Sequence, residues 1–162
     1  MRADEIRIVP KYDDAAVAPG MLAPLSDLRG FMIADPAPDV RGWKVVLRDG
    51  GKVGKVDDLL VDTTRMVVRY LEVKVDRHVI LSDEDTWVLV PVEAARFDRR
   101  DHVVVLHTLP AAGLAAAPRY QRGVPTPEQE RAIRDYYARS AETAAPVRGE
   151  TLERPPRGEK RR

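Results

Sequence analysis

Two short clusters of acidic residues are the strongest candidates in this chain for metal binding or proton transfer. They are Asp57-Asp58, inside an apolar run, and Asp83-Glu84-Asp85. A calcium loop alternates its ligands along the chain, and neither cluster does so. Grouped carboxylates near an interface can instead relay protons. We interpret both clusters as turns in contact with solvent, and name as candidate proton-relay residues Asp57, Asp58, Glu72, Asp83, Glu84 and Asp85.

A glycine-rich run at 50–55, GGKVGK, resembles a phosphate-binding loop. A Walker motif, however, needs glycine where Asp49 stands and serine or threonine where Val56 stands. Asp49-Gly50-Gly51 tolerates positive φ and so suits a tight reversal of the chain. We therefore interpret this run as the turn of a β-hairpin.

Other catalytic and metal-binding signals are weak. The chain has no cysteine, which excludes disulfides, thiolate catalysis and cysteine-ligated zinc. His102 and His107 are five positions apart, an odd offset, so on one strand they would lie on opposite faces and share no metal. No serine, histidine and acid are grouped as a nucleophilic site requires. We expect no enzymatic activity and no metal.

The elements that carry these residues are short strands. Apolar residues alternate with charged ones over 43–48, which predicts a strand with one buried face. The next strand, over 52–61, changes phase near Asp57, which indicates a bulge. Met66 to Val75 is apolar on both faces, as in the wall of a closing barrel.

Further short strands are expected at 78–81, 87–91 and 102–106, with a turn over 98–101. About six such strands suit a small barrel or a strongly bent sheet. Within it, Arg41 and Arg69 are expected to be buried ion-pair partners of Asp39 and Glu72, respectively.

The segments outside the strands differ in composition. Residues 1–38 are rich in Pro, Ala and Asp and are expected to form an extended arm whose order depends on contacts. Beyond a connector, Thr126, Pro127 and Gln129 predict a helix start with a capping box. Its apolar stripe, Ile133, Tyr136 and Tyr137, predicts a docking helix, with Glu130, Arg131, Arg134 and Asp135 facing water.

Charge and hydropathy limit the partners. The 27 Lys and Arg nearly balance the 26 Asp and Glu, so no nucleic-acid partner is expected. No apolar run approaches the roughly 18 residues that span a bilayer. The basic, proline-rich tail over 146–162 either meets anionic lipid headgroups or is a solubilising free end.

The runs RGWKV, DGGKVGKVDDLLVD, VRYLEV and LVP, in this order, resemble a PRC-barrel domain. This small β-barrel is shared by the H subunit of photosynthetic reaction centres and a ribosome-maturation factor. The resemblance to H subunits extends to Pro24 and Gly30-Phe31 before the barrel and to Leu114 and Pro118 after it. It implies a mainly β fold, a small PRC-type barrel at 39–110. The extended arm at 1–38 precedes it, and the connector and docking helix at 111–145 and the irregular basic tail at 146–162 follow.

The H-subunit resemblance implies a non-catalytic subunit on the cytoplasmic face of the photosynthetic inner membrane. It would cap the membrane-embedded core subunits and stabilise the quinone region, binding no cofactor itself, with bacteriochlorophyll and quinone held by its partners. H subunits carry an N-terminal transmembrane helix that is absent here, so this chain is expected either to be an anchorless version or to need a separate transmembrane anchor polypeptide as a further partner. The candidate partner-interface residues are Phe31, Arg41, Tyr120, Ile133, Tyr136, Tyr137, Arg154, Arg157 and Arg161.

The chain also departs from H subunits. Their surface histidines have no equivalents around 19–22, and Arg65 replaces an acid before the VRYLEV strand, so proton delivery is not implied. The motif DVRGW and the helix with Tyr136-Tyr137 equally resemble free-standing soluble PRC-barrel adaptors, some of them stress-related. The ribosome-maturation family places an RNA-related domain before its barrel, and the first 38 residues are too few for one.

Overall fold

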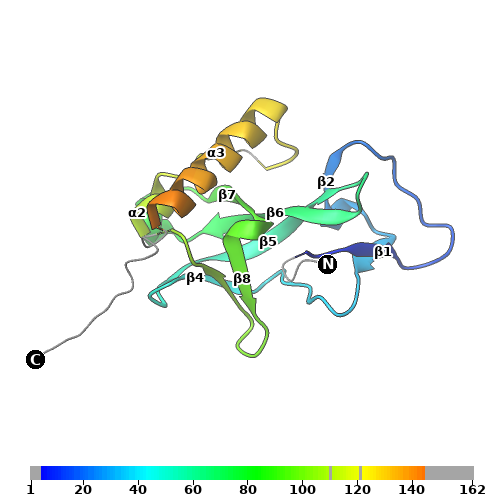
Figure 1. The fold of residues 1–162 in the computed structure, drawn as a ribbon, viewed down its shortest axis with the longest axis horizontal. Helices are drawn as coiled ribbons and strands as arrows, with labels where there is room; N and C mark the ends of the chain where they lie inside the picture. The colour runs from blue at the N-terminus through cyan, green and yellow to red at the C-terminus, as the bar shows by residue number, and fades with distance from the viewer. Residues whose placement is uncertain (1–4, 110, 121, 145–162) are drawn as a thin grey trace, which may run out of the picture.

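One strongly curled sheet forms the body of the protein (Figure 1). The computed structural model describes residues 5–109, 111–120 and 122–144. Within them the strand order is β7-β6-β5-β4-β9-β8, and β2 also pairs with β5. All pairs are antiparallel except β4 with β9. The fold is therefore mainly β and closes part of the way to a barrel, as the strand pattern predicts.

The strands and helices have the following bounds. The strands are β1 (Ile8–Pro10), β2 (Leu22–Pro24), β3 (Phe31–Ile33), β4 (Lys44–Leu47), β5 (Lys52–Asp62), β6 (Val67–Val75), β7 (Thr86–Pro91), β8 (Ala95–Asp98) and β9 (Val103–Leu106). The helices are α1 (Arg77–Ile80), α2 (Ala111–Ala115) and α3 (Pro127–Ala144), and the 3-10 turns are η1 (Leu25–Asp27) and η2 (Val92–Ala94).

The hairpin between β4 and β5 is confirmed at the glycine-rich run. Gly50 has a φ of 93° and donates its N–H to the carbonyl of Leu47 at 2.8 Å, while Leu47 N–H donates to Gly51 O at 3.0 Å. A non-glycine residue is strained at such a φ. The run is thus a chain reversal, with no phosphate-loop helix after it.

Strand β5 carries the predicted bulge. Its pairing with β6 skips a residue between Val56 and Asp58, so Asp57 has no residue opposite it. Gly54, the third residue of β5, lies so close to β6 that an added Cβ would sit 2.5 Å from the carbonyl oxygen of Lys74. The backbones therefore approach here as only glycine allows.

Strand β6 is buried on both faces, as predicted for a barrel wall. Tyr70 on one face and Leu71 and Val73 on the other are all fully buried. Helix α3 covers one of these faces, because the Tyr70 hydroxyl bonds to Glu130 and Arg134 of that helix.

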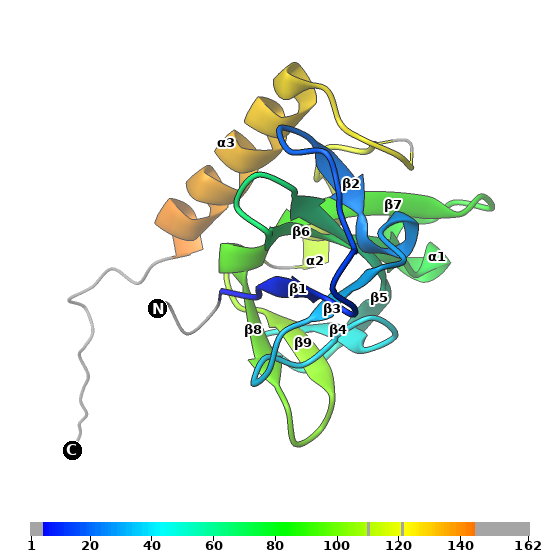
Figure 2. The same ribbon diagram turned by 90° about the vertical axis from the view of Figure 1, so that its right-hand side faces the viewer.

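The N-terminal arm belongs to the same core (Figure 2). The carbonyl of Ile6 accepts from Val68 N–H at 2.8 Å, and Ile8 N–H donates to Met66 O at 3.0 Å, so the arm lies along the start of β6. Ile6 and Leu25 are 2% and 3% exposed. The arm was expected to depend on outside contacts for its order, but its buried side chains contact the barrel of the same chain.

The prediction of a strand at 78–81 is wrong. This segment is the single helical turn α1, and Leu81 ends it in the left-handed region with a φ of 52°. The sequence does not alternate there, because Val79, Ile80 and Leu81 are consecutive apolar residues. A helical turn reverses the chain between β6 and β7, which are antiparallel neighbours.

Helix α3 begins at the predicted capping box. Thr126 Oγ1 accepts from Gln129 N–H at 3.1 Å, and Gln129 Oε1 accepts from Thr126 N–H at 2.8 Å. Pro127 is the first helical residue. The helix then crosses the β7 side of the sheet (Figure 1).

Candidate functional site

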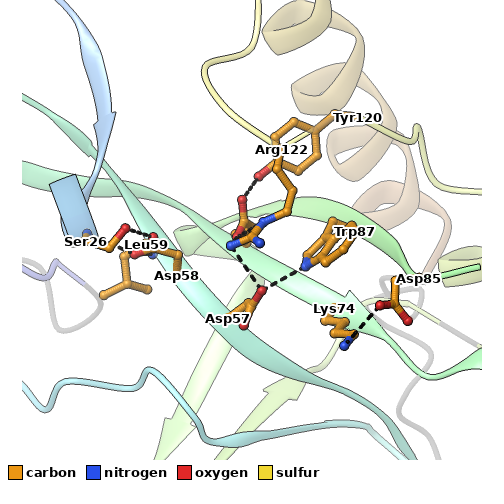
Figure 3. A network of polar contacts seen from close by, with 10 residues as sticks. Ser26, Asp57, Asp58, Leu59, Lys74, Asp85, Trp87, Tyr120 and Arg122 are labelled. Atoms are coloured by element: carbon orange, nitrogen blue, oxygen red, sulfur yellow. Dashed lines mark hydrogen bonds and ion pairs between the residues drawn. The ribbon is translucent and has the colours of Figure 1, made fainter.

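A polar network on β5 and β6 gathers three of the predicted acidic residues (Figure 3). Asp58 on β5 lies directly opposite Glu72 on β6, and the bulge places Asp57 beside them. Asp58 is 4% exposed and Glu72 is 2% exposed. Buried carboxylates are costly unless they are hydrogen-bonded or paired, so their partners determine what the site can do.

Glu72 is held by the connector that follows α2. Tyr120 Oη donates a short hydrogen bond to Glu72 Oε2. Arg122 donates to Glu72 Oε1 from Nη2 at 3.2 Å and from Nε at 3.3 Å. Both carboxylate oxygens are thus satisfied by residues about 50 positions later in the chain.

Asp57 shares Arg122 with Glu72. Its Oδ2 lies 3.3 Å from Arg122 Nη2 and accepts from Trp87 Nε1–H at 2.9 Å. The Arg122 guanidinium stands 5.0 Å from the centre of the Trp87 ring, a cation–π distance. One arginine therefore joins two carboxylates and an indole across β5, β6 and β7.

Asp58 faces a different segment. Its carboxylate accepts from Ser26 Oγ–H at 2.5 Å, Ser26 N–H at 3.3 Å and Leu59 N–H at 2.8 Å. Ser26 lies in η1 of the arm. Asp58 thus ties the arm to β5, much as Glu72 ties the connector to β6.

Tyr120 and Arg122 both hold their protons more tightly within this network. Burial, and then the hydrogen bond to Glu72, raises the pKa of Tyr120 far above its usual range. Burial acts to lower the pKa of Arg122, but the nearby charges of Glu72 and Asp57 outweigh it and raise that pKa overall. Tyr120 is therefore a fixed donor and Arg122 a fixed cation.

The second acidic cluster lies apart from this network, between α1 and β7. Asp85 pairs with Arg77 at 3.0 Å and with Lys74 at 3.4 Å. The hydrogen bond from Arg77 is the largest effect on the pKa of Asp85, which is lowered. Asp83 and Glu84 are exposed, so these three acids form the surface turn that the sequence indicates.

The predicted ion pairs are partly wrong. Arg41 does pair with Asp39, at 2.5 Å, but on the surface. Arg69 pairs with Asp62 at 3.2 Å and not with Glu72. Burial acts to raise the pKa of Asp62, but hydrogen bonds from the backbone of Arg65 and Thr64 and from Arg69 lower it overall.

Most of the described candidate interface residues are buried within the chain itself. Phe31, Tyr120, Ile133 and Tyr137 are 7%, 6%, 1% and 4% exposed. Tyr136 is half-buried and donates from its hydroxyl to the carbonyl of Gly113. Arg41 alone of the described candidates is exposed. Arg154, Arg157 and Arg161 lie outside the described residues.

Helix α3 consequently docks on its own barrel. Tyr70 Oη on β6 donates to Glu130 Oε1 at 2.9 Å and accepts from Arg134 Nε at 2.9 Å. Two residues expected to face water therefore bind the sheet. Burial, then the hydrogen bond to Glu130, raises the pKa of Tyr70.

The histidines flank a strand without sharing a ligand. His102 and His107 lie just outside β9, and His102 stacks on Trp43 with ring centroids 4.9 Å apart. Within the part of the chain that the structure describes, no group of three or more His, Asp or Glu side chains is placed to bind a metal ion.

An exposed apolar surface, which the sequence analysis missed, lies on the two-stranded ribbon of β1 and β3. Val9 and Met32 are opposite each other across the ribbon and are 37% and 46% exposed. Tyr12, which lies over Gly30, is 55% exposed. We call Val9, Tyr12 and Met32 the ribbon patch. Its signal in the sequence is the alternation of buried and exposed apolar residues in two short runs.

Two further observations concern membrane spans and the protein family. Among the described residues, no helix is both long and apolar enough to serve as a membrane span. The PRC-barrel domain family matches residues 32–112, half of the 162-residue chain. The matched region runs from β3 to the start of α2 and includes Asp57, Asp58 and Glu72. The chain therefore belongs to the PRC-barrel domain family.

Proposed function

We propose that this protein is a non-catalytic subunit that docks on the cytoplasmic face of the membrane-embedded core of a photosynthetic reaction centre and caps its quinone region. It binds no cofactor itself, and the bacteriochlorophyll and quinone belong to its partners.

The observation that carries this proposal is the way the arm folds. The H-subunit resemblance extends beyond the barrel at Pro24 and Gly30-Phe31, and these residues lie in and beside β2 and β3. The same segment presents the ribbon patch. Exposed apolar residues that cluster on one face are typical of protein interaction sites, so the ribbon patch is the surface that we assign to the core subunits.

The polar network has a structural role in this proposal. Arg122 pairs with both Glu72 and Asp57, and Ser26 donates a hydrogen bond to Asp58. These contacts hold the arm and the connector on the barrel, so that the docking surface is formed before the partner arrives. Preorganisation of this kind lowers the entropic cost of association.

Affinity purification from pigmented membranes tests the proposal. The tagged full chain should elute from detergent-solubilised membranes with the near-infrared absorbance of bacteriochlorophyll. The variant Val9→Asp/Met32→Asp should lose that absorbance, because charge on the ribbon patch opposes burial. Leu81→Asp is the matched control, since Leu81 is 89% exposed. It follows the end of β6, whereas the arm that carries the ribbon patch contacts the start of β6. Elution of the wild-type chain without pigment would contradict the proposal.

A second candidate is a free-standing PRC-barrel adaptor. It is favoured by the burial of Phe31, Ile133 and Tyr137 within the chain, because both flanks then have their contacts without a host. This candidate predicts that the purified chain is stable alone and that no pigment accompanies it.

A further inference from the structure

Strand β8 has an open edge. It ends the strand order and pairs only with β9 among the described strands. Figure 2 shows β8 at the margin of the barrel. Beside it lies a groove of about 530 Å³, whose lining includes β8 residues, the segment Pro36 to Pro38, and Glu5 and Ile6 of the arm. An unpaired edge presents backbone N–H and C=O groups that can pair with another strand.

The side chains of β8 complement a second copy of the same strand. Arg96 and Asp98 are exposed, whereas Ala95 is buried and Phe97 is half-buried. Arg96 lines the groove together with Ala95 and Phe97. If two β8 strands pair antiparallel about an axis at Phe97, Arg96 of each lies opposite Asp98 of the other, and the two Phe97 rings are neighbours. Opposite charges and aromatic pairs at directly opposed positions stabilise antiparallel strands. A parallel pairing in register would instead oppose like charges.

Arg96 and Asp98 are both free to pair with a second copy. Asp98 uses Oδ1 to accept from the backbone N–H groups of Arg100 and Asp101, at 3.0 and 3.1 Å, so Oδ2 can receive a partner's guanidinium. In the described part of the chain, Arg96 forms no ion pair. Charges on an edge strand commonly prevent pairing, but here their signs alternate so that an antiparallel copy is attracted.

We propose that two copies of this chain form a two-fold symmetric dimer through antiparallel pairing of their β8 strands, which joins the two sheets into one. The contact is isologous, as closed dimers require. The dimer does not rest on the reaction-centre proposal, because the ribbon patch is on β1 and β3 and takes no part in it.

Sedimentation velocity on the full chain, over a concentration series, tests this dimer. The wild type should shift from monomer to dimer as its concentration rises. Arg96→Asp places an aspartate at position 96 opposite Asp98 of the other copy, and Asp98→Arg places an arginine at position 98 opposite Arg96 of the other copy. Because like charges then face each other, each variant alone should raise the dissociation constant at least about tenfold. An equimolar mixture of the two variants should dimerise like the wild type, because every opposed pair is again of opposite charge.

Arg100→Asp is the matched control, since Arg100 is an exposed residue of the adjoining turn, outside the strand, and contributes only its backbone there. It should leave the dimer unchanged. Asp98→Arg removes a turn contact, so circular dichroism must show that it is folded. If it is not, Arg96→Asp decides alone, because Arg96 has no part in the turn. A wild type that stays monomeric up to about 1 mM, or a dimer that Arg96→Asp does not weaken, overturns the proposal.

Discussion

Tyr120 donates its hydroxyl hydrogen to Glu72, a residue that lies 48 positions earlier in the chain and is 2% exposed. This bond joins the connector before α3 to the centre of β6. The buried carboxylate has few other donors, because Arg122 reaches only its other oxygen. The position of the connector and the satisfaction of Glu72 therefore depend on each other.

Removal of this hydroxyl should destabilise the fold. Tyr120→Phe leaves a buried carboxylate oxygen without its donor, and we expect the free energy of unfolding to fall by about 2 kcal/mol. Urea unfolding followed by fluorescence measures the change. Tyr12→Phe is the matched control, because Tyr12 is 55% exposed, and it should change stability very little. Equal effects of the two variants would show that Tyr120 contributes only its ring.

A methyl group at Gly54 should be poorly tolerated. The Cβ of alanine would lie 2.5 Å from Lys74 O and 3.1 Å from Val73 Cγ1, and the nearer atom is backbone in a paired strand. We expect Gly54→Ala to cost about 2 kcal/mol or more. In Gly51→Ala the new Cβ meets only a side-chain oxygen of Asp49, at 3.2 Å. Thermal unfolding should therefore separate the two variants clearly, and similar midpoints would contradict the close approach of β5 and β6.

Local signals allowed much of the fold to be predicted from the sequence. The turn at Gly50, the bulge at Asp57 and the cap at Thr126 each depend on residues a few positions apart, and all three are present. The partner predicted for Glu72, Arg69, was wrong and none was predicted for Asp58, because the actual partners come from the connector and the arm. The apolar stripe of α3 was recognised, but amphipathicity does not say whether the covering surface belongs to the same chain. The edge strand β8 was missed because four residues give too short a pattern.

The capping box of α3 should contribute measurably to stability. Thr126→Ala removes the acceptor for Gln129 N–H, and helix caps of this kind are worth about 1 kcal/mol. Thr126→Ser keeps the hydroxyl and should behave as the wild type. Circular dichroism at 222 nm during urea unfolding compares the three proteins. If the alanine and serine variants were equally stable, the cap would make no contribution.

His107 should make the fold less stable in mild acid. Burial, and then repulsion from Arg96 and Arg48, lowers its pKa below 6.5 in the folded state. As the pH falls below 6.5, the unfolded chain binds a proton that the folded chain does not, so the free energy of unfolding decreases. Above that pH neither state is protonated there, and the penalty is absent.

Urea midpoints measured from neutral pH down to about pH 5.5 would show this effect. His107→Gln should lose stability less steeply than the wild type over that range. His78→Gln, at an exposed position of α1, controls for the loss of a histidine as such and should keep the wild-type slope. If His107→Gln lost stability with falling pH as steeply as the wild type, His107 would not be the source of the acid sensitivity.

The packing of both flanks on the barrel is tested most directly by native-state hydrogen exchange on the isolated full chain. The amides of Ile8 in the arm, and of Ile133 and Tyr137 in α3, should be protected nearly as strongly as those of β6, because these residues belong to the same core. The contrary result is fast exchange throughout the arm and α3 beside a protected barrel. That result would mean that the flanks become ordered only on a partner.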